Sequence, residues 1–129
     1  MKAMVFSEYG SANMLQPQQL EKPTPKNNQV LIKLKACSIN DWDWGLLTGK
    51  PFVNRMLCGV FRPKRISVLG SDIAGIVESV GQDVKNFKPG DEVIGDLCGK
   101  YWGGFAEYVC ATEDVLTLKP GNMTFEDAA

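Results

Sequence analysis

The chain has 129 residues, of which 44% are hydrophobic and 22% are charged, which is typical of an ordinary soluble domain. Its 14 basic and 15 acidic side chains leave a net charge of −1, so the overall balance favours neither a nucleic acid nor an anionic membrane as partner. Histidine is absent, which excludes Ser-His and Cys-His nucleophiles and removes the commonest zinc ligand.

The four cysteines do not have the short spacing of a structural zinc site, and we expect them to be reduced and partly buried. The apolar start of the chain is too short for a signal peptide, and no apolar run has the length of a membrane span. We therefore expect one cytoplasmic domain over residues 1–129, with no metal and with neither nucleic acid nor membrane as partner.

In chain order, the pattern of apolar residues predicts several short strands separated by Gly and Pro turns. They are expected at residues 2–6, 16–21, 30–37, 72–80, 92–96, 104–110 and 115–118. The clearest alternation places Ile32 and Leu34 on one face of a strand and Lys33 and Lys35 on the other. Many short strands with little helix predict a mainly β domain, either a barrel or a sandwich.

Two helix starts interrupt the strands. Residues 41–47 are expected to form a short helix with Asn40 or Asp41 as its N-cap. Thr124 caps a second helix start, followed by acidic residues in the first turn. Because the chain ends inside that second element, we interpret its end as a truncation.

The segment 50–65 is basic and contains Pro near both ends, which predicts an irregular surface loop. Its apolar residues Leu57 and Phe61 could fold back as a lid. Further along, Lys88-Pro89-Gly90-Asp91 predicts a type II turn in which Gly90 takes a positive φ.

The glycines of residues 68–93 could serve phosphate binding or strand packing. Gly70 and Gly75 have the spacing of a phosphate-binding loop, but the lysine that should follow is missing. The dinucleotide fingerprint Gly-x-Gly-x-x-Gly occurs nowhere in the chain. We therefore expect these glycines to allow close packing of strands.

Residues 37–44, directly after the clearest strand, have two possible interpretations. They could be a solvated turn with two tryptophans packed against the barrel, or the floor of a substrate site. For a substrate site they offer the amide of Asn40, the carboxylate of Asp43 and the aromatic surfaces of Trp42 and Trp44. Similarly, Trp102 lies either in a purely conformational Gly turn or at a pocket rim.

Three segments carry a resemblance to a known family. They are the glycine-rich run 68–93, the stretch Gly103-Gly104-Phe105-Ala106-Glu107-Tyr108-Val109 and the ending Phe125-Glu126-Asp127-Ala128-Ala129. Together they resemble the N-terminal GroES-like catalytic domain of the medium-chain dehydrogenase/reductase superfamily. The resemblance implies a GroES-like, partly open β-barrel with short helices, truncated before a Rossmann domain.

Within that superfamily the chain resembles the zinc-independent, quinone-oxidoreductase-like branch. Zinc alcohol dehydrogenases have a ligand cysteine where this chain has Asn40, and a His-Glu pair where it has Ser71 and Asp72. The quinone-oxidoreductase-like members instead have Asn-x-x-Asp at this corner, which Asn40 and Asp43 match. Several of them carry an active-site tyrosine at the position of Gly45, which this chain lacks.

The resemblance implies an NAD(P)H-dependent oxidoreductase that transfers hydride to or from a small carbonyl compound, enone, quinone or alcohol without a metal. NADP(H) or NAD(H) would bind the Rossmann domain that this chain lacks, so the chain alone should be inactive. A homodimeric parent enzyme is consistent with this branch. The alternative is a free-standing GroES-like binding or assembly module without enzymatic activity.

The same resemblance implies roles for individual residues. Asn40 would be the catalytic residue, orienting substrate or nicotinamide through its amide. Substrate would contact Trp42, Trp44 and Trp102. Asp43, Ser71 and Asp72 would not contact the substrate but would hold the residues that do.

Overall fold

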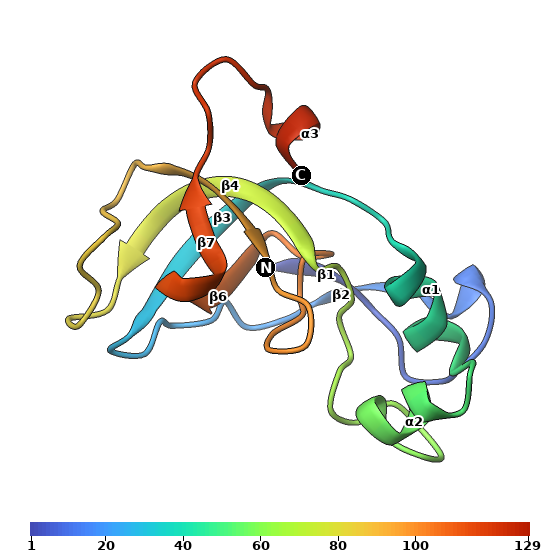
Figure 1. The fold of residues 1–129 in the computed structure, drawn as a ribbon. Coiled ribbons are helices and arrows are strands. Elements are labelled where there is room, and N and C mark those ends of the chain that lie inside the picture. Colours follow the sequence, from blue (N-terminus) through green and yellow to red (C-terminus); the bar gives the residue numbers. More distant parts are fainter.

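The computed structural model describes residues 1–129 and consists mainly of strands (Figure 1). The strands are β1 (Lys2–Val5), β2 (Gln16–Gln19), β3 (Gln29–Cys37), β4 (Asp72–Val80), β5 (Glu92–Asp96), β6 (Tyr108–Thr112) and β7 (Leu116–Leu118). The helices are α1 (Asp41–Thr48), α2 (Val53–Cys58) and α3 (Phe125–Ala128), with 3-10 turns at Ala12–Met14 and Glu113–Val115. No helix has the length and apolar character needed to cross a lipid bilayer.

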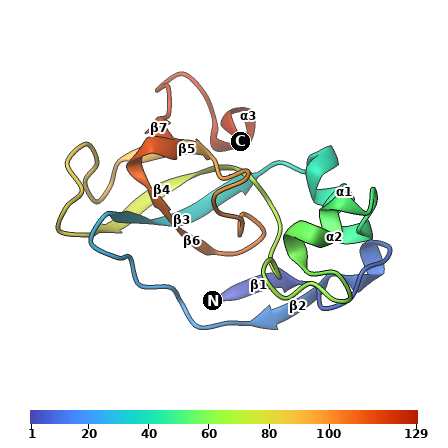
Figure 2. The same cartoon turned by 60° about the horizontal axis from the view of Figure 1, so that its bottom comes forward.

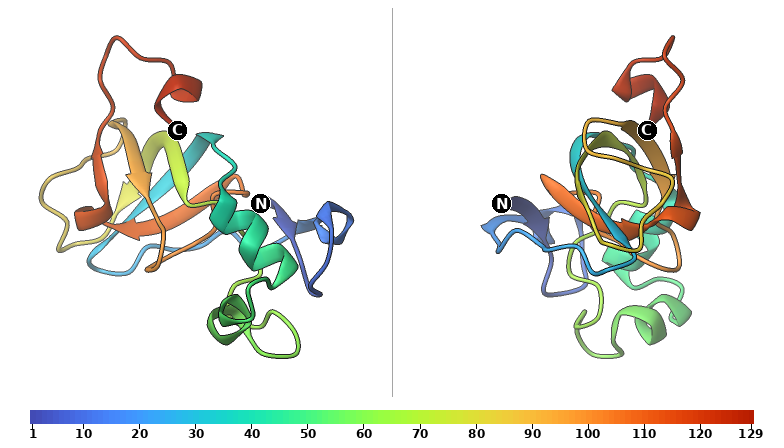
Figure 3. Two further views of the ribbon diagram at one scale, coloured as in Figure 1. Left: turned by 45° about the vertical axis from the view of Figure 1, so that its right-hand side comes forward. Right: turned by 90° about the vertical axis from the view of Figure 1, so that its left-hand side faces the viewer.

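Five of the strands form one antiparallel sheet in the order β6-β3-β4-β5-β7. The sheet curls, most visibly in the right-hand view of Figure 3, but its edge strands β6 and β7 do not pair with each other. The remaining strands, β1 and β2, form a separate antiparallel pair. The predicted mainly β, partly open barrel with short helices is therefore confirmed.

The main core lies inside the curled sheet. Its buried members are Val30, Ile32, Ile73, Val77, Val93, Leu97, Val109 and Ala111. The alternation predicted for β3 holds where Ile32 is buried and Lys33 is exposed. Since full burial of a Val or Ile side chain contributes about 1.5–3 kcal/mol, this cluster is the main source of the barrel's stability.

Two glycines behave as the sequence predicts. A Cβ on Gly75 would lie 2.5 Å from the carbonyl oxygen of Lys33, so only glycine lets β4 approach β3 this closely. Gly90 has a φ of 94°, as the predicted type II turn requires.

Two segments differ from the prediction. Strand β6 begins at Tyr108 instead of residue 104, because residues 105 and 106 run beside β1, where Phe105 accepts a hydrogen bond from the Met4 amide. The loop predicted at residues 50–65 contains helix α2, and Phe61 does not fold back but is 92% exposed.

Helices α1 and α2 form a lobe at one end of the molecule, beside the β1–β2 pair and away from most of the large sheet (Figures 1 and 2). A second buried cluster holds this lobe together. It consists of Phe6, Leu46, Leu47, Cys58 and Leu69. The corner between β3 and α1, where the sequence predicts the site, therefore lies between two packed cores.

Candidate functional site

The corner between β3 and α1 is held by the buried carboxylate of Asp43, which is only 2% exposed. Its Oδ2 accepts a hydrogen bond of 2.9 Å from the backbone amide of Asn40, the N-cap of α1. Its Oδ1 accepts one of 2.8 Å from the backbone amide of Gly70, just before β4. One side chain thus joins the start of the helix to the neighbouring chain segment, which fixes the position of Asn40.

The side-chain amide of Asn40 points into a polar cluster. Its Nδ2 donates to the Oδ2 of Asp72 over 2.8 Å and lies 3.4 Å from the hydroxyl oxygens of Ser38 and Ser71. The Ser38 hydroxyl also donates to Asp72 over 3.3 Å. Of the predicted site residues, Asn40, Asp43, Ser71 and Asp72 are therefore brought together at one corner.

The donor atoms of this corner do not fit a zinc ion. Around Asn40 the corner offers an amide, the hydroxyls of Ser38 and Ser71 and the carboxylate of Asp72, whereas structural zinc is held mainly by thiolate and imidazole. Nowhere are three or more Cys, Asp or Glu side chains grouped so that they could hold a metal. Burial, with smaller effects from Asp43 and Asp72, raises the pKa of the nearby Cys37 thiol to about 12, so that thiol stays protonated.

A mostly apolar cleft of about 680 Å³ opens between α1, the end of α2 and the loop before β6. Trp42 and Trp102 both line it, together with Leu57 from α2 and Tyr101. Trp44 and Asn40 are not among its lining residues. The volume and apolar lining are those of a site for a small organic molecule.

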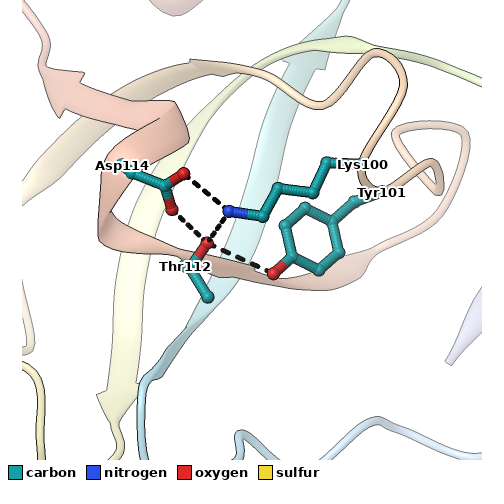
Figure 4. Close-up of polar contacts among 4 residues, drawn as sticks. All are labelled: Lys100, Tyr101, Thr112 and Asp114. Carbon is teal, nitrogen blue, oxygen red and sulfur yellow. Dashed lines mark hydrogen bonds and ion pairs between the residues drawn. The ribbon is translucent and has the colours of Figure 1, made fainter.

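One wall of this cleft is anchored by four polar residues, shown in Figure 4. Lys100 Nζ lies 2.6 Å from the Oδ2 of Asp114 and 3.0 Å from the hydroxyl of Thr112. The Tyr101 hydroxyl donates to that same hydroxyl over 3.2 Å. Hydrogen bonding to Lys100 lowers the pKa of the Asp114 carboxyl, and the same contact raises the pKa of Lys100.

These contacts fix the two residues just before Trp102, which the sequence analysis singled out without its neighbours. Gly103, which follows Trp102, has a φ of 123°, a conformation that favours glycine. Trp102 itself lines the cleft, so the turn is conformational and also places a tryptophan at the pocket. The sequence analysis did not identify Lys100 and Tyr101 as site residues. Their only sequence signal is that they directly precede the Trp-Gly-Gly turn.

Gly45 occupies a place where a side chain would not fit. An added Cβ would lie 2.7 Å from the Nδ2 of Asn54, a buried α2 residue that donates to the carbonyl oxygen of Lys50. Helix α2 therefore packs so closely against α1 at Gly45 that no space remains there for a larger side chain.

Comparisons with known proteins agree with this geometry. The alcohol dehydrogenase GroES-like domain family matches residues 26–121. The chain is 38% identical over 132 residues to the chloroplast envelope quinone oxidoreductase homolog of Arabidopsis thaliana, a match that covers all of this chain and 38% of that protein.

Solved structures give the same result. The quinone oxidoreductase of Coxiella burnetii superposes with a TM-score of 0.89 and 34% identity, over all of this chain and 40% of the other. The Escherichia coli quinone oxidoreductase complexed with NADPH superposes with a TM-score of 0.83 and 27% identity, over 99% of this chain and 36% of the other. The chain thus spans less than half the length of these relatives. It belongs to the alcohol dehydrogenase GroES-like domain family, and its similarity is to that domain of quinone oxidoreductases.

Proposed function

We propose that this chain is the substrate-binding and catalytic part of an oxidoreductase that uses NADPH or NADH to reduce a small quinone, enone or related carbonyl compound. The observation that carries the proposal is the Asn40 corner, because Asn40 caps helix α1, which contributes Trp42 to an apolar cleft, in a chain whose relatives are quinone oxidoreductases. One of the similar structures holds NADPH. A soluble, cytoplasmic, homodimeric parent enzyme belongs to the same proposal.

The nicotinamide cofactor supplies the hydride when it is bound, and the chain's own residues need only hold and polarise the acceptor. Asn40 would donate a hydrogen bond to the substrate oxygen or to the nicotinamide amide. Trp42 and Trp102 would enclose the apolar part of the substrate, and Trp44 is the third aromatic candidate. A neutral amide does not ionise near neutral pH and cannot serve as a general acid or base, so its role is orientation.

The residues behind Asn40 would act as positioning residues. Asp43 fixes the backbone at the start of α1, and Asp72 with Ser71 holds the amide in one orientation. Because the donor atoms present do not fit zinc, the proposed reaction runs without a metal on this chain.

The test is NADPH oxidation by the polypeptide in which this chain is joined to a dinucleotide-binding domain, with a naphthoquinone or an enone as acceptor. We expect turnover that is unchanged by chelators and slowed when the transferred hydrogen of the cofactor is deuterium. The 129-residue chain alone should not oxidise NADPH, since it lacks the dinucleotide fingerprint. Loss of activity on chelation, together with stoichiometric zinc, would contradict the metal-free mechanism.

The alternative function is a free-standing binding or assembly module of the same fold. Such a module would assemble into a ring and would be a large oligomer by light scattering. We expect a monomer instead, and a ring of several chains would favour the module.

A further inference from the structure

Helix α2 and the residues that flank it expose most of their apolar side chains, while the polar Asn54 is buried, which departs from the pattern of an ordinary surface helix. The exposed members are Phe52 at 61%, Val53 at 56%, Met56 at 60%, Leu57 at 51%, Val60 at 44% and Phe61 at 92%. We refer to these six residues as the α2 apolar surface. On the inward side of the helix, Asn54 and Cys58 are buried. Contiguous exposed apolar side chains of this kind mark a surface for a partner or a membrane.

This surface belongs to a well-packed part of the molecule. Cys58 packs in the second core cluster, and the Tyr9 hydroxyl donates to the carbonyl oxygen of Gly59 directly after the helix. The guanidinium of Arg55 lies 4.7 Å from the centre of the Tyr9 ring and donates to the carbonyl oxygen of Gly49. The α2 apolar surface is therefore presented in a fixed shape.

The same segment is strongly basic, although the whole chain has a net charge of −1. Residues 50–65 contain no Asp or Glu and five basic residues, namely Lys50, Arg55, Arg62, Lys64 and Arg65. The one ion pair that this segment makes joins Arg62 to Glu8, 3.6 Å apart, with both side chains largely exposed. Lys50 and Lys64 are exposed and make no ion pair. Near its two ends, the segment that carries the α2 apolar surface therefore holds an exposed lysine without an ion pair, whereas Arg55 is turned toward Tyr9.

We propose that the α2 apolar surface docks on an anionic lipid bilayer, inserting Phe52 and Phe61 among the lipid headgroups while the flanking lysines and arginines contact lipid phosphates. Exposed apolar residues beside basic ones, with no acidic residue between them, are the pattern of interfacial membrane binding. A second copy of the chain fits less well, because it would bring two segments without any acidic residue, each with exposed Lys50 and Lys64, against each other. Binding of this kind is peripheral and does not depend on the oxidoreductase activity.

The test is cosedimentation of the chain with phosphatidylcholine vesicles, with and without phosphatidylserine. We expect binding to the vesicles that contain phosphatidylserine and little to phosphatidylcholine alone, with loss of binding at high salt. The double variant Lys50→Glu/Lys64→Glu should bind at least about thirtyfold more weakly. Phe52→Ser/Phe61→Ser should bind at least about tenfold more weakly, because two exposed aromatic side chains no longer insert.

Matched controls come from the rest of the surface. Lys26→Glu/Lys85→Glu makes the same charge change at two exposed lysines outside the segment, and Leu118→Ser removes an apolar side chain that is 58% exposed on β7. Both controls should bind like the unchanged chain, and circular dichroism should show that every variant is folded. Equal weakening by the controls would mean that binding follows net charge alone and would overturn the proposal.

Two other outcomes would also overturn it. Absence of binding to phosphatidylserine vesicles is the first. The second is concentration-dependent self-association that Phe52→Ser/Phe61→Ser abolishes, which would make a second copy the occupant. If the chain binds vesicles but the polypeptide that joins it to a dinucleotide-binding domain does not, the surface is an interface between domains, and the proposal fails.

Discussion

The side-chain amide of Asn40 donates a hydrogen bond of 2.8 Å to the carboxylate of Asp72, which lies 32 positions further along the chain. The two residues meet because β3 and β4 pair antiparallel with Cys37 opposite Ile73. The residues just after β3 therefore lie beside those at the start of β4. The candidate catalytic amide is consequently oriented by a charged partner even before any substrate binds.

From this contact we predict that Asn40→Ala lowers the free energy of unfolding by about 1.5 kcal/mol, since a hydrogen bond to a charged group contributes about that much. Urea unfolding of the 129-residue chain measures the change. Asn28→Ala is the matched control, because it makes the same change at an exposed asparagine away from this corner. Equal stability of the two variants would mean that the bond to Asp72 contributes nothing.

In the proposed oxidoreductase, Asn40→Ala should also lower kcat/KM about tenfold, because one orienting hydrogen bond to the reacting molecule is lost. Steady-state kinetics with a quinone acceptor tests this. Asn40→Asp should be worse, since it places a second carboxylate beside Asp72. If Asn40→Ala loses stability but keeps its turnover, the amide is structural, and the interpretation of this corner as a turn is correct.

Asp43→Ala should be the most destabilising change at this corner, lowering the free energy of unfolding by about 3 kcal/mol. It removes the acceptor for the backbone amides of Asn40 and Gly70, and each unsatisfied buried donor costs about 1–3 kcal/mol. Asp43→Asn keeps one acceptor oxygen and should lose about half as much. The control is Asp41→Ala, in the same helical turn but exposed, which should change stability by less than about 1 kcal/mol.

The sequence was sufficient to predict most of the barrel but less of the lobe. Strand β4 is found at the predicted residues 72–80, because its β-branched residues face a core and its glycines permit close pairing. Helix α2 was missed because its apolar residues face outward and Asn54 faces inward, so its periodicity does not point to a buried face. The bond between Asn40 and Asp72 depends on the register of two strands, which spacing along the chain does not reveal.

Gly45 provides a test of how tightly α2 packs on α1. Alanine in a helix is favoured over glycine by about 1 kcal/mol. Here, however, its Cβ would lie 2.7 Å from Asn54, and overpacking costs about 1–3 kcal/mol. We therefore expect Gly45→Ala to lower the melting temperature.

A second substitution identifies the cause. Gly45→Ala should be partly rescued by Asn54→Ala in the double variant, since the colliding amide is then absent. Gly121→Ala, at an exposed glycine whose Cβ would have no neighbour within 4 Å, is the neutral control. A melting temperature that rises in Gly45→Ala would show that α2 moves aside easily.

The last prediction concerns the thiol of Cys37, whose pKa is raised from the ordinary 9.0 to about 12, first by burial and then by the charges of Asp43 and Asp72. The folded state therefore keeps this proton between pH 9 and 12, while the unfolded chain releases it. Since the unfolded state binds fewer protons over that range, the free energy of unfolding must fall as the pH rises, and the contribution is complete below pH 9. Urea unfolding at several alkaline pH values should show this decline, and Cys37→Ala should decline less steeply. Cys98, which is less buried, should react faster with iodoacetamide than Cys37 at pH 8. An identical pH dependence in Cys37→Ala, or faster labelling of Cys37, would mean that its thiol is not held in the protonated form.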